Sequence, residues 1–291
     1  MSSGITTCCG APNPSEKEEL DKKIKEEVKK AYAAAIKQGS CCGSSGKTSA
    51  AMETALKATK LGYQKEELSD VPQNAAQSTF GCGNPLAFSG VKEGDIVLDL
   101  GSGAGLDCFL AAKRVGPAGR VIGLDMTPDM IEKATANARE GGYSNVEFRL
   151  GEMELMPVEN NAVDWVISNC VINLSPDKRA VFSEAFRVLR PGGRVLISDI
   201  VTNGIPEDFK KANFNWSGCI GGALEEKDYL DIISQVGFKN VRVVNKVEQV
   251  MAKVYEAPVE KLSPFSRKIR EEYPEELGRK ILSVQIYAEK P

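Results

Sequence analysis

Residues 95–125 read DIVLDLGSGAGLDCFLAAKRVGPAGRVIGLD. The apolar run at 96–100 predicts a buried strand, the glycine-rich turn after it opens a helix, and a second strand at 120–125 ends on an acid. The glycines let the chain turn sharply and approach a ligand without a Cβ in the way. Asp125 follows Gly105 by 20 residues, at a strand end where a carboxylate can accept both hydroxyls of a ribose. This spacing predicts a nucleotide-type cofactor on an α/β sheet.

Apolar β-branched runs alternate with helical periods along the rest of the chain. Strands are expected at 146–150, 163–169 and 194–200, and helices at about 106–115, 127–139 and 177–189. This alternation predicts βαβ units and a mostly parallel sheet with helices on both faces. A helix at 225–236 and a strand at 241–247 follow, and the alternating stretch LSVQIYAEK at 282–290 is expected to complete the sheet edge.

The 291 residues divide into three expected segments. Residues 1–77 form a helical amino-terminal arm with a cysteine-bearing loop, and the charge pattern at 15–38 predicts a mostly solvated helix. Residues 78–204 form the cofactor-binding core. Residues 205–291 form a substrate-binding carboxy-terminal region, because the stretch around 206–223 loses periodicity and gathers aromatic residues with glycines.

Composition excludes several classes of function. The formal charge is −3 and no basic block is present, so the electrostatic footprint of nucleic-acid binding is missing. No apolar run approaches the roughly 18 residues of a membrane span, and the start lacks a secretory layout, so a cytoplasmic protein is expected. The chain contains no histidine, which removes Ser-His and Cys-His nucleophiles and the commonest general base.

The chain has eight cysteines, which the cytosol would keep reduced. Cys82 lies in FGCGNP before the first strand, Cys170 follows the strand at 163–169, and Cys219 lies in WSGCIGG. Ligands of open α/β sheets collect outside the carboxyl ends of the strands, where these three thiols could converge. Three thiols without histidine neighbours suit a soft, thiophilic centre better than zinc. Cys108, in the apolar helix, is interpreted as a small buried hydrophobe.

The G-x-G-x-G loop, the acid in LGEMELMP and the stretch FRVLRPGGRVLISD at 186–199 resemble class I S-adenosylmethionine methyltransferases. The resemblance implies their Rossmann-like fold and S-adenosylmethionine as co-substrate, with no metal cofactor. It also implies Asp125 on the ribose and Glu152 with Met153 near the adenine. The remaining contacts that it implies are Phe80, Asp99, Gly101, Gly103, Met126 and Asn169.

A narrower resemblance covers about residues 60–240. GCGNP, GLDMTPDM, ISNCVINLSPDK and SGCIGGAL are similar to arsenite S-adenosylmethionine methyltransferases. That family's arsenic-binding thiols fall at Cys82, Cys170 and Cys219, and its further redox thiol falls at Cys41 or Cys42, which both remain candidates. Family members often carry tyrosine where this chain has Phe80, a change that keeps stacking and loses a hydroxyl contact.

This resemblance implies methyl transfer to arsenite, or to thiol-conjugated arsenite, with thioredoxin or glutathione as reductant. Arsenic(III) on three thiolates keeps a lone pair, so attack on the methyl group needs no general base. One alternative is a methyltransferase of a small organic acceptor, which would usually need a base. Another is a non-catalytic protein that sequesters metalloid through Cys8, Cys9, Cys41, Cys42 and Cys219.

Overall fold

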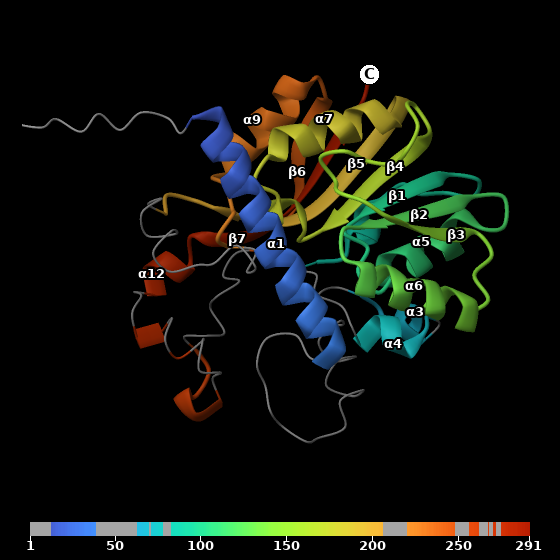
Figure 1. Cartoon of the computed structure of the whole chain (residues 1–291), viewed down its shortest axis with the longest axis horizontal. Coiled ribbons are helices and arrows are strands. Elements are labelled where there is room, and N and C mark those ends of the chain that lie inside the picture. Colours follow the sequence, from blue (N-terminus) through green and yellow to red (C-terminus); the bar gives the residue numbers. More distant parts are fainter. Residues whose placement is uncertain are drawn as a thin grey trace, which may run out of the picture.

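A computed structural model of the chain describes residues 13–38, 63–69, 71–77, 83–205, 220–247, 256–261, 267, 270–271 and 275–291 (Figure 1). Several residues singled out by the sequence lie outside these ranges. They are Cys8, Cys9, Cys41, Cys42, Phe80, Cys82 and Cys219.

Seven strands of the described residues form one sheet in the order β3-β2-β1-β4-β5-β7-β6. Their bounds are β1 Ile96–Leu100, β2 Arg120–Asp125, β3 Val146–Leu150, β4 Val163–Asn169, β5 Leu189–Thr202, β6 Lys239–Val247 and β7 Ile281–Glu289. The first five strands are mutually parallel, and β7 is antiparallel to both β5 and β6. The mostly parallel sheet expected from the sequence is therefore confirmed. The strand order reverses between β1 and β4, where ligands of such sheets bind.

The expected place of the last strand was wrong. β7 does not complete the sheet edge but lies between β5 and β6, so that β6 is the edge strand. The physical reason is burial: Ile281, Leu282, Val284, Ile286 and Ala288 of β7 are all buried. β6 instead has no fully buried residue, and Lys239, Arg242 and Lys246 are among its exposed positions; charged side chains are one way in which natural edge strands avoid pairing with other chains. Two strands of the expected carboxy-terminal segment thus belong to the same sheet as the core.

Helices cover both faces of the sheet, as expected. On one face α7 (Lys178–Val188) and α9 (Glu226–Val236) join a core that includes Leu98, Val166, Phe182 and Tyr229. On the other, α5 (Leu106–Val115) joins a core that includes Val97, Phe109, Trp165 and Leu196. Successive residues of β1 alternate between the two cores because strand side chains alternate in direction. The remaining elements are α3 Lys65–Ser69, α4 Gln73–Gln77, α6 Pro128–Glu140, α12 Glu275–Gly278 and the short turns η1 Pro85–Phe88, η2 Ile172–Leu174 and η3 Val259–Lys261.

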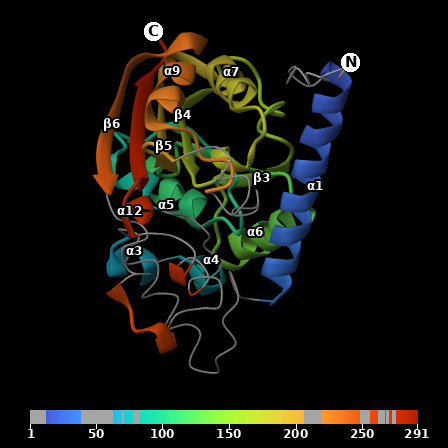
Figure 2. The ribbon, with the colours of Figure 1, turned by 90° about the vertical axis from the view of Figure 1, so that its left-hand side faces the viewer.

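The amino-terminal arm contains α1 (Pro14–Gln38), which runs along one flank of the domain beside α6 (Figure 2). Its outer face is solvated, as expected. Ile24, Val28 and Ile36, however, recur at one side of the helix and are buried against Leu174 and Met130. One face of α1 therefore packs on the domain through an apolar stripe, and the opposite face is exposed to solvent.

Candidate cofactor and substrate site

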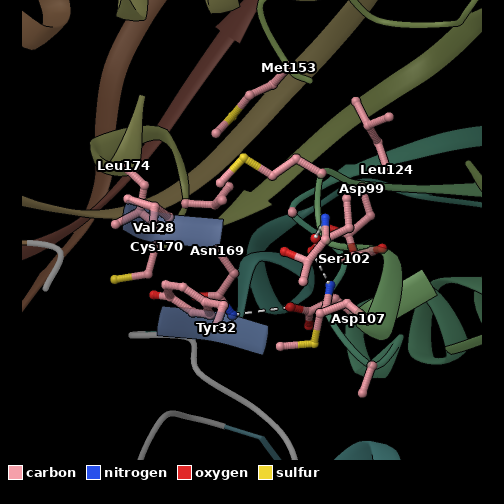
Figure 3. Close-up of a pocket in the computed structure, with 18 of the residues that line it drawn as sticks. Val28, Tyr32, Asp99, Ser102, Asp107, Leu124, Met153, Asn169, Cys170 and Leu174 are labelled. Atoms are coloured by element: carbon pink, nitrogen blue, oxygen red, sulfur yellow. Dashed lines mark hydrogen bonds between the residues drawn. The ribbon is translucent and has the colours of Figure 1, made fainter. Parts of the chain in front are cut away.

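A pocket opens at the carboxyl ends of β1, β2 and β4, under the buried side of α1 (Figure 3). It is here that the structure gathers most of the described residues singled out by the sequence. The lining includes Asp99, Gly101, Gly103, Asp125, Met126, Met153, Asn169 and Cys170.

The turn after β1 brings the backbone against the pocket. Gly101 and Gly103 both have positive φ, 66° and 53°, a conformation that side chains other than glycine rarely adopt. A Cβ on Gly101 would lie 2.4 Å from the Val171 side chain, so this position has no room for one. The loop passes close to the pocket because both positions are glycine.

Asp125 ends β2 with its carboxylate held by the loop. One oxygen accepts the Gly103 N–H at 3.0 Å and the other accepts the Thr127 N–H at 2.8 Å. Burial raises the pKa of this carboxyl, while the backbone donors oppose that rise. A carboxylate has about four acceptor positions, so each oxygen retains capacity for one of two adjacent hydroxyls.

The structure separates the two acids of LGEMELMP. Glu152 does not line the pocket; its side chain is 45% exposed and pairs with the Lys25 ammonium at 2.6 Å. Glu154 does line it, with a side chain only 13% exposed that lies 3.3 Å from Lys25 and accepts the Ser175 hydroxyl at 2.6 Å. Sequence reasoning missed Glu154 and Lys25. Glu154 could be recognised as the second acid of the loop that contains Glu152. No residue near Lys25 in the sequence indicates that Lys25 belongs to the site.

A buried acidic cluster forms the opposite end of the pocket. Asn169 donates to Asp107 at 3.1 Å and to the Tyr63 hydroxyl at 2.9 Å, and Tyr63 donates to Asp107 at 2.8 Å. Burial raises the pKa of Asp107 to about 6 despite these donors. Burial, and then the nearby charge of Asp107, raises the pKa of Asp99 well above its ordinary value. Asp107 and Tyr63 were also missed, although an acid in an otherwise apolar helix was a visible signal for Asp107.

The two described cysteines differ. Cys108 is a free thiol, fully buried as expected, and donates to Asp99 at 3.3 Å; burial raises its pKa well above the ordinary value. Cys170 lines the pocket and is disulfide-bonded. It stands in the left-handed region with φ of 63°, uncommon for a residue with a side chain, and its N–H donates to the Ser198 carbonyl at 2.7 Å.

The lining fits a positively charged nucleoside derivative. Leu124, Met126, Met130 and Met153 offer an apolar surface for a base, and Val28 and Tyr32 of α1 close over it. In Figure 3 the carboxyl groups of Asp99 and Asp107 lie away from Cys170. A cation bound beside these two carboxyl groups would therefore leave the space next to the Cys170 sulfur open. The Ser102 hydroxyl in the lining is buried with no hydrogen-bond partner among the described residues. A bound ligand could supply that partner.

Two features are absent from the described ranges. No group of three His, Cys, Asp or Glu side chains there is arranged to hold a metal ion. None of the helices in those ranges combines the length and apolar character that a bilayer crossing requires.

Comparisons with known proteins agree with this geometry. Residues 91–237 match a family model described as a methyltransferase domain. An arsenite methyltransferase of Halobacterium salinarum is 42% identical over 257 residues, which are 84% of this chain and 66% of that protein. The mouse arsenite methyltransferase is 37% identical over 212 residues, 68% of this chain and 56% of the relative. The chain thus spans between about half and two thirds of these curated relatives.

A solved structure extends the comparison to three dimensions. The crystal structure of an arsenic(III) S-adenosylmethionine methyltransferase from Chlamydomonas reinhardtii is 36% identical, with a TM-score of 0.63, over 77% of this chain and 72% of that one. The sheet, the glycine loop and the pocket at the strand ends define the class I methyltransferase fold. Within that class, the chain belongs to the arsenite methyltransferase family.

Proposed function

We propose that this protein transfers methyl groups from S-adenosylmethionine to arsenic(III) held by the thiolates of Cys82, Cys170 and Cys219. The observation that carries the proposal is that Cys170 lines the same pocket as the glycine loop and Asp125. A thiol ligand for the acceptor and the cofactor-binding residues thus face a common space. Cys82 and Cys219 enter through the family resemblance.

The described residues have distinct parts in binding the cofactor. Asp125 accepts the ribose hydroxyls, and the acidic cluster of Asp99 and Asp107 attracts the positive methionine end. Met126 and Met153 pack against the base. The Lys25 ammonium on α1 neutralises Glu154 beside the pocket, where an unpaired carboxylate would be costly to bury.

The bound cofactor supplies a sulfonium-linked, electrophilic methyl group. The arsenic lone pair forms the new As–C bond while the S–CH₃ bond breaks and its electrons stay on sulfur. Because arsenic loses no proton before attack, the reaction needs no general base. The protein then contributes mostly alignment, which is worth up to about 7 to 11 kcal/mol in well-oriented systems.

Each transfer raises arsenic formally to the pentavalent state, and thiols must return two electrons before the next. Cys41 or Cys42 would take part in the resulting disulfide, and thioredoxin or glutathione of the cytosol would reduce it by thiol exchange. The disulfide-bonded state of Cys170 accords with such a cycle, since only the reduced thiolate is a ligand. A reductant is therefore required before arsenite binds.

The test combines purified protein, arsenite, S-adenosylmethionine and dithiothreitol, and measures methylated arsenic by mass spectrometry. Wild type and Cys108→Ser, a change of the buried free thiol, should form product. Cys170→Ser should lose at least about 99% of the rate and keep its cofactor affinity, whereas Asp125→Ala should weaken cofactor binding by roughly tenfold, about one lost charged hydrogen bond.

Two results would overturn the proposal. One is full turnover by Cys170→Ser, which would remove this thiol as a ligand. The other is a wild-type protein that binds arsenite without methylating it, as a sequestering protein would, or that methylates only quinones or sterols.

A further inference from the structure

Three polar side chains lie in a row across the sheet beside Cys170. Asn169 of β4 is paired in register with Ser198 of β5, and Ser198 is paired with Gln285 of β7. Partners in register point to the same face of a sheet. Ser198 and Gln285 are both buried, with 0% and 5% exposure. We call Asn169, Ser198 and Gln285 the polar row.

The polar row receives the backbone of Gly83 and Asn84. The Asn169 amide accepts the Gly83 N–H at 3.2 Å and donates to the Gly83 carbonyl at 2.7 Å. The Gln285 amide donates to the Asn84 carbonyl at 2.8 Å and to the Ser198 hydroxyl at 3.1 Å. Residues 83–84 are thus held to β4 and β7 by hydrogen bonds from two side chains, Asn169 and Gln285, that lie far from them in sequence.

The fit between loop and row is close. A Cβ on Gly83 would lie 3.0 Å from the Ser198 hydroxyl oxygen, tighter than ordinary contact, although the φ of Gly83 is unremarkable. Glycine is therefore favoured at this position by the space against the row.

Gln285 is an unexpected residue for its position. The strand around it is apolar, and the oxygen of its amide is buried with no hydrogen-bond partner among the described residues. Burying an unpartnered amide oxygen destabilises a fold, and an aliphatic side chain would avoid that. The amide nitrogen, however, donates to the Asn84 carbonyl and to the Ser198 hydroxyl. These two hydrogen bonds are what glutamine provides at this position and an aliphatic side chain would not.

The row connects the strand that carries Cys170 to the loop that follows Cys82. Cys170 follows Asn169 directly, and its N–H donates to the Ser198 main-chain carbonyl as part of the β4–β5 pairing. In sequence Gly83 directly follows Cys82, the second predicted thiol ligand. The side chains of Asn169 and Gln285 therefore hold the backbone next to Cys82 against the strand whose end carries Cys170.

We propose that the polar row positions the thiols for arsenic(III), with Gln285 as its remote member. The inference rests on the proposed function. Asn169 also lines the cofactor pocket, but Gln285 and Gly83 do not, so changes at these two residues separate metalloid binding from cofactor binding. They are positioning residues and touch neither substrate.

The test uses full-length reduced protein, arsenite alone and X-ray absorption at the arsenic edge. Gln285→Met keeps the length of the side chain and removes both donor contacts. We expect the arsenite dissociation constant to rise on the order of tenfold and the arsenic–sulfur number to fall from three to two, with the S-adenosylmethionine dissociation constant unchanged. Gly83→Ala should do the same from the loop side, and Ser168→Ala is the matched control, because the Ser168 hydroxyl is buried without a hydrogen-bond partner among the described residues and lies on the opposite face of β4 from Asn169.

The outcomes separate the two proposals. A wild-type protein that shows no three-sulfur arsenic site contradicts the proposed function itself. A wild-type three-sulfur site that both Gln285→Met and Gly83→Ala retain with unchanged arsenite affinity overturns the role of the polar row. Equal weakening of arsenite and cofactor binding would also overturn it, because that pattern is general destabilisation.

Discussion

Asp107 shows how burial changes a single carboxyl. Its ordinary pKa is close to 4, and in the pocket burial raises the pKa to about 6, so the folded protein holds a proton there in mildly acidic solution. The group that raises the Asp99 pKa further is Asp107 itself. Two further charges act on Asp107 in opposite directions, since Arg114 of the same helix α5 lowers the Asp107 pKa and Glu67 of α3 raises it. Asp107 therefore changes its charge near pH 6.

A positively charged cofactor should bind more tightly as this proton leaves. A cation stabilises the carboxylate, so binding releases protons wherever Asp107 is protonated in the free protein. We expect the dissociation constant of S-adenosylmethionine to fall by up to about tenfold per unit as pH rises from 5 to 6, and to level off above 7. Calorimetry at pH 5, 6 and 7.5 measures it. Asp107→Asn should flatten this profile, and a wild-type constant independent of pH contradicts the charge linkage.

The site residues that could be predicted from the sequence are those that belong to one continuous motif. Gly101, Gly103 and Asp125 come from one strand–turn–helix–strand unit whose spacing is written in 31 consecutive residues. Asp107 and Glu154 reach the pocket through tertiary packing, and Tyr63 reaches Asp107 in the same way. Each acid is visible in the sequence, but its neighbours along the chain do not show which carboxyl faces a ligand. The choice between Glu152 and Glu154 depends on Lys25, which lies 127 residues from Glu152.

At the scale of elements, α1 closes the pocket with few contacts. It contributes Lys25, Val28 and Tyr32 to the lining and buries only three aliphatic side chains in the described structure. Burial lowers the pKa of Lys25, but Glu152 and Glu154 outweigh this effect and leave it raised, so the lysine stays charged. The charge pattern predicted this helix and not its docking, because a short apolar stripe on a charged helix does not reveal its partner.

The Lys25 ion pairs should help to hold α1 over the cofactor. Its side chain is 21% exposed, so the pairs are less screened than surface pairs, which are worth about 0 to 1 kcal/mol. We expect Lys25→Ala to raise the cofactor dissociation constant roughly threefold to tenfold, about 1 kcal/mol, and to speed proteolysis within residues 14–38. Lys22→Ala is the control, because Lys22 pairs with Glu18 at full solvent exposure, 73% and 70%. Equal effects of both changes would contradict a closing role for Lys25.

For the whole molecule, β7 joins the parallel part of the sheet to β6. It pairs along its length with β5 on one side and with β6 on the other, and its inward side chains enter both cores. Sequence patterns indicated a β-strand here and misplaced it, because hydrogen-bonded neighbours are a property of topology. Its nearly continuous burial is that of a central strand, but the polar Ser283 and Gln285 interrupt the apolar run and make the sequence read as alternating.

Removal of residues 281–291 should therefore abolish folding and not merely trim an edge. Ile281, Leu282, Val284 and Ile286 are each worth about 1.5 to 3 kcal/mol when buried, which together approaches the total stability of a typical domain, about 5 to 15 kcal/mol. We expect the truncated chain to lose its cooperative thermal transition by circular dichroism and to aggregate in gel filtration. A soluble product with a native-like spectrum would contradict this.

The place of β7 has a consequence during synthesis. A ribosome makes β7 after every other strand of this sheet, although β6 cannot pair until β7 arrives between it and β5. The nascent chain must therefore keep an unpaired strand edge and the apolar residues of β5 exposed while more than thirty further residues, 248–280, are translated. Such an interval favours aggregation, so a cell that makes this protein quickly depends on chaperones to protect the growing polypeptide until β7, the last strand made, is inserted.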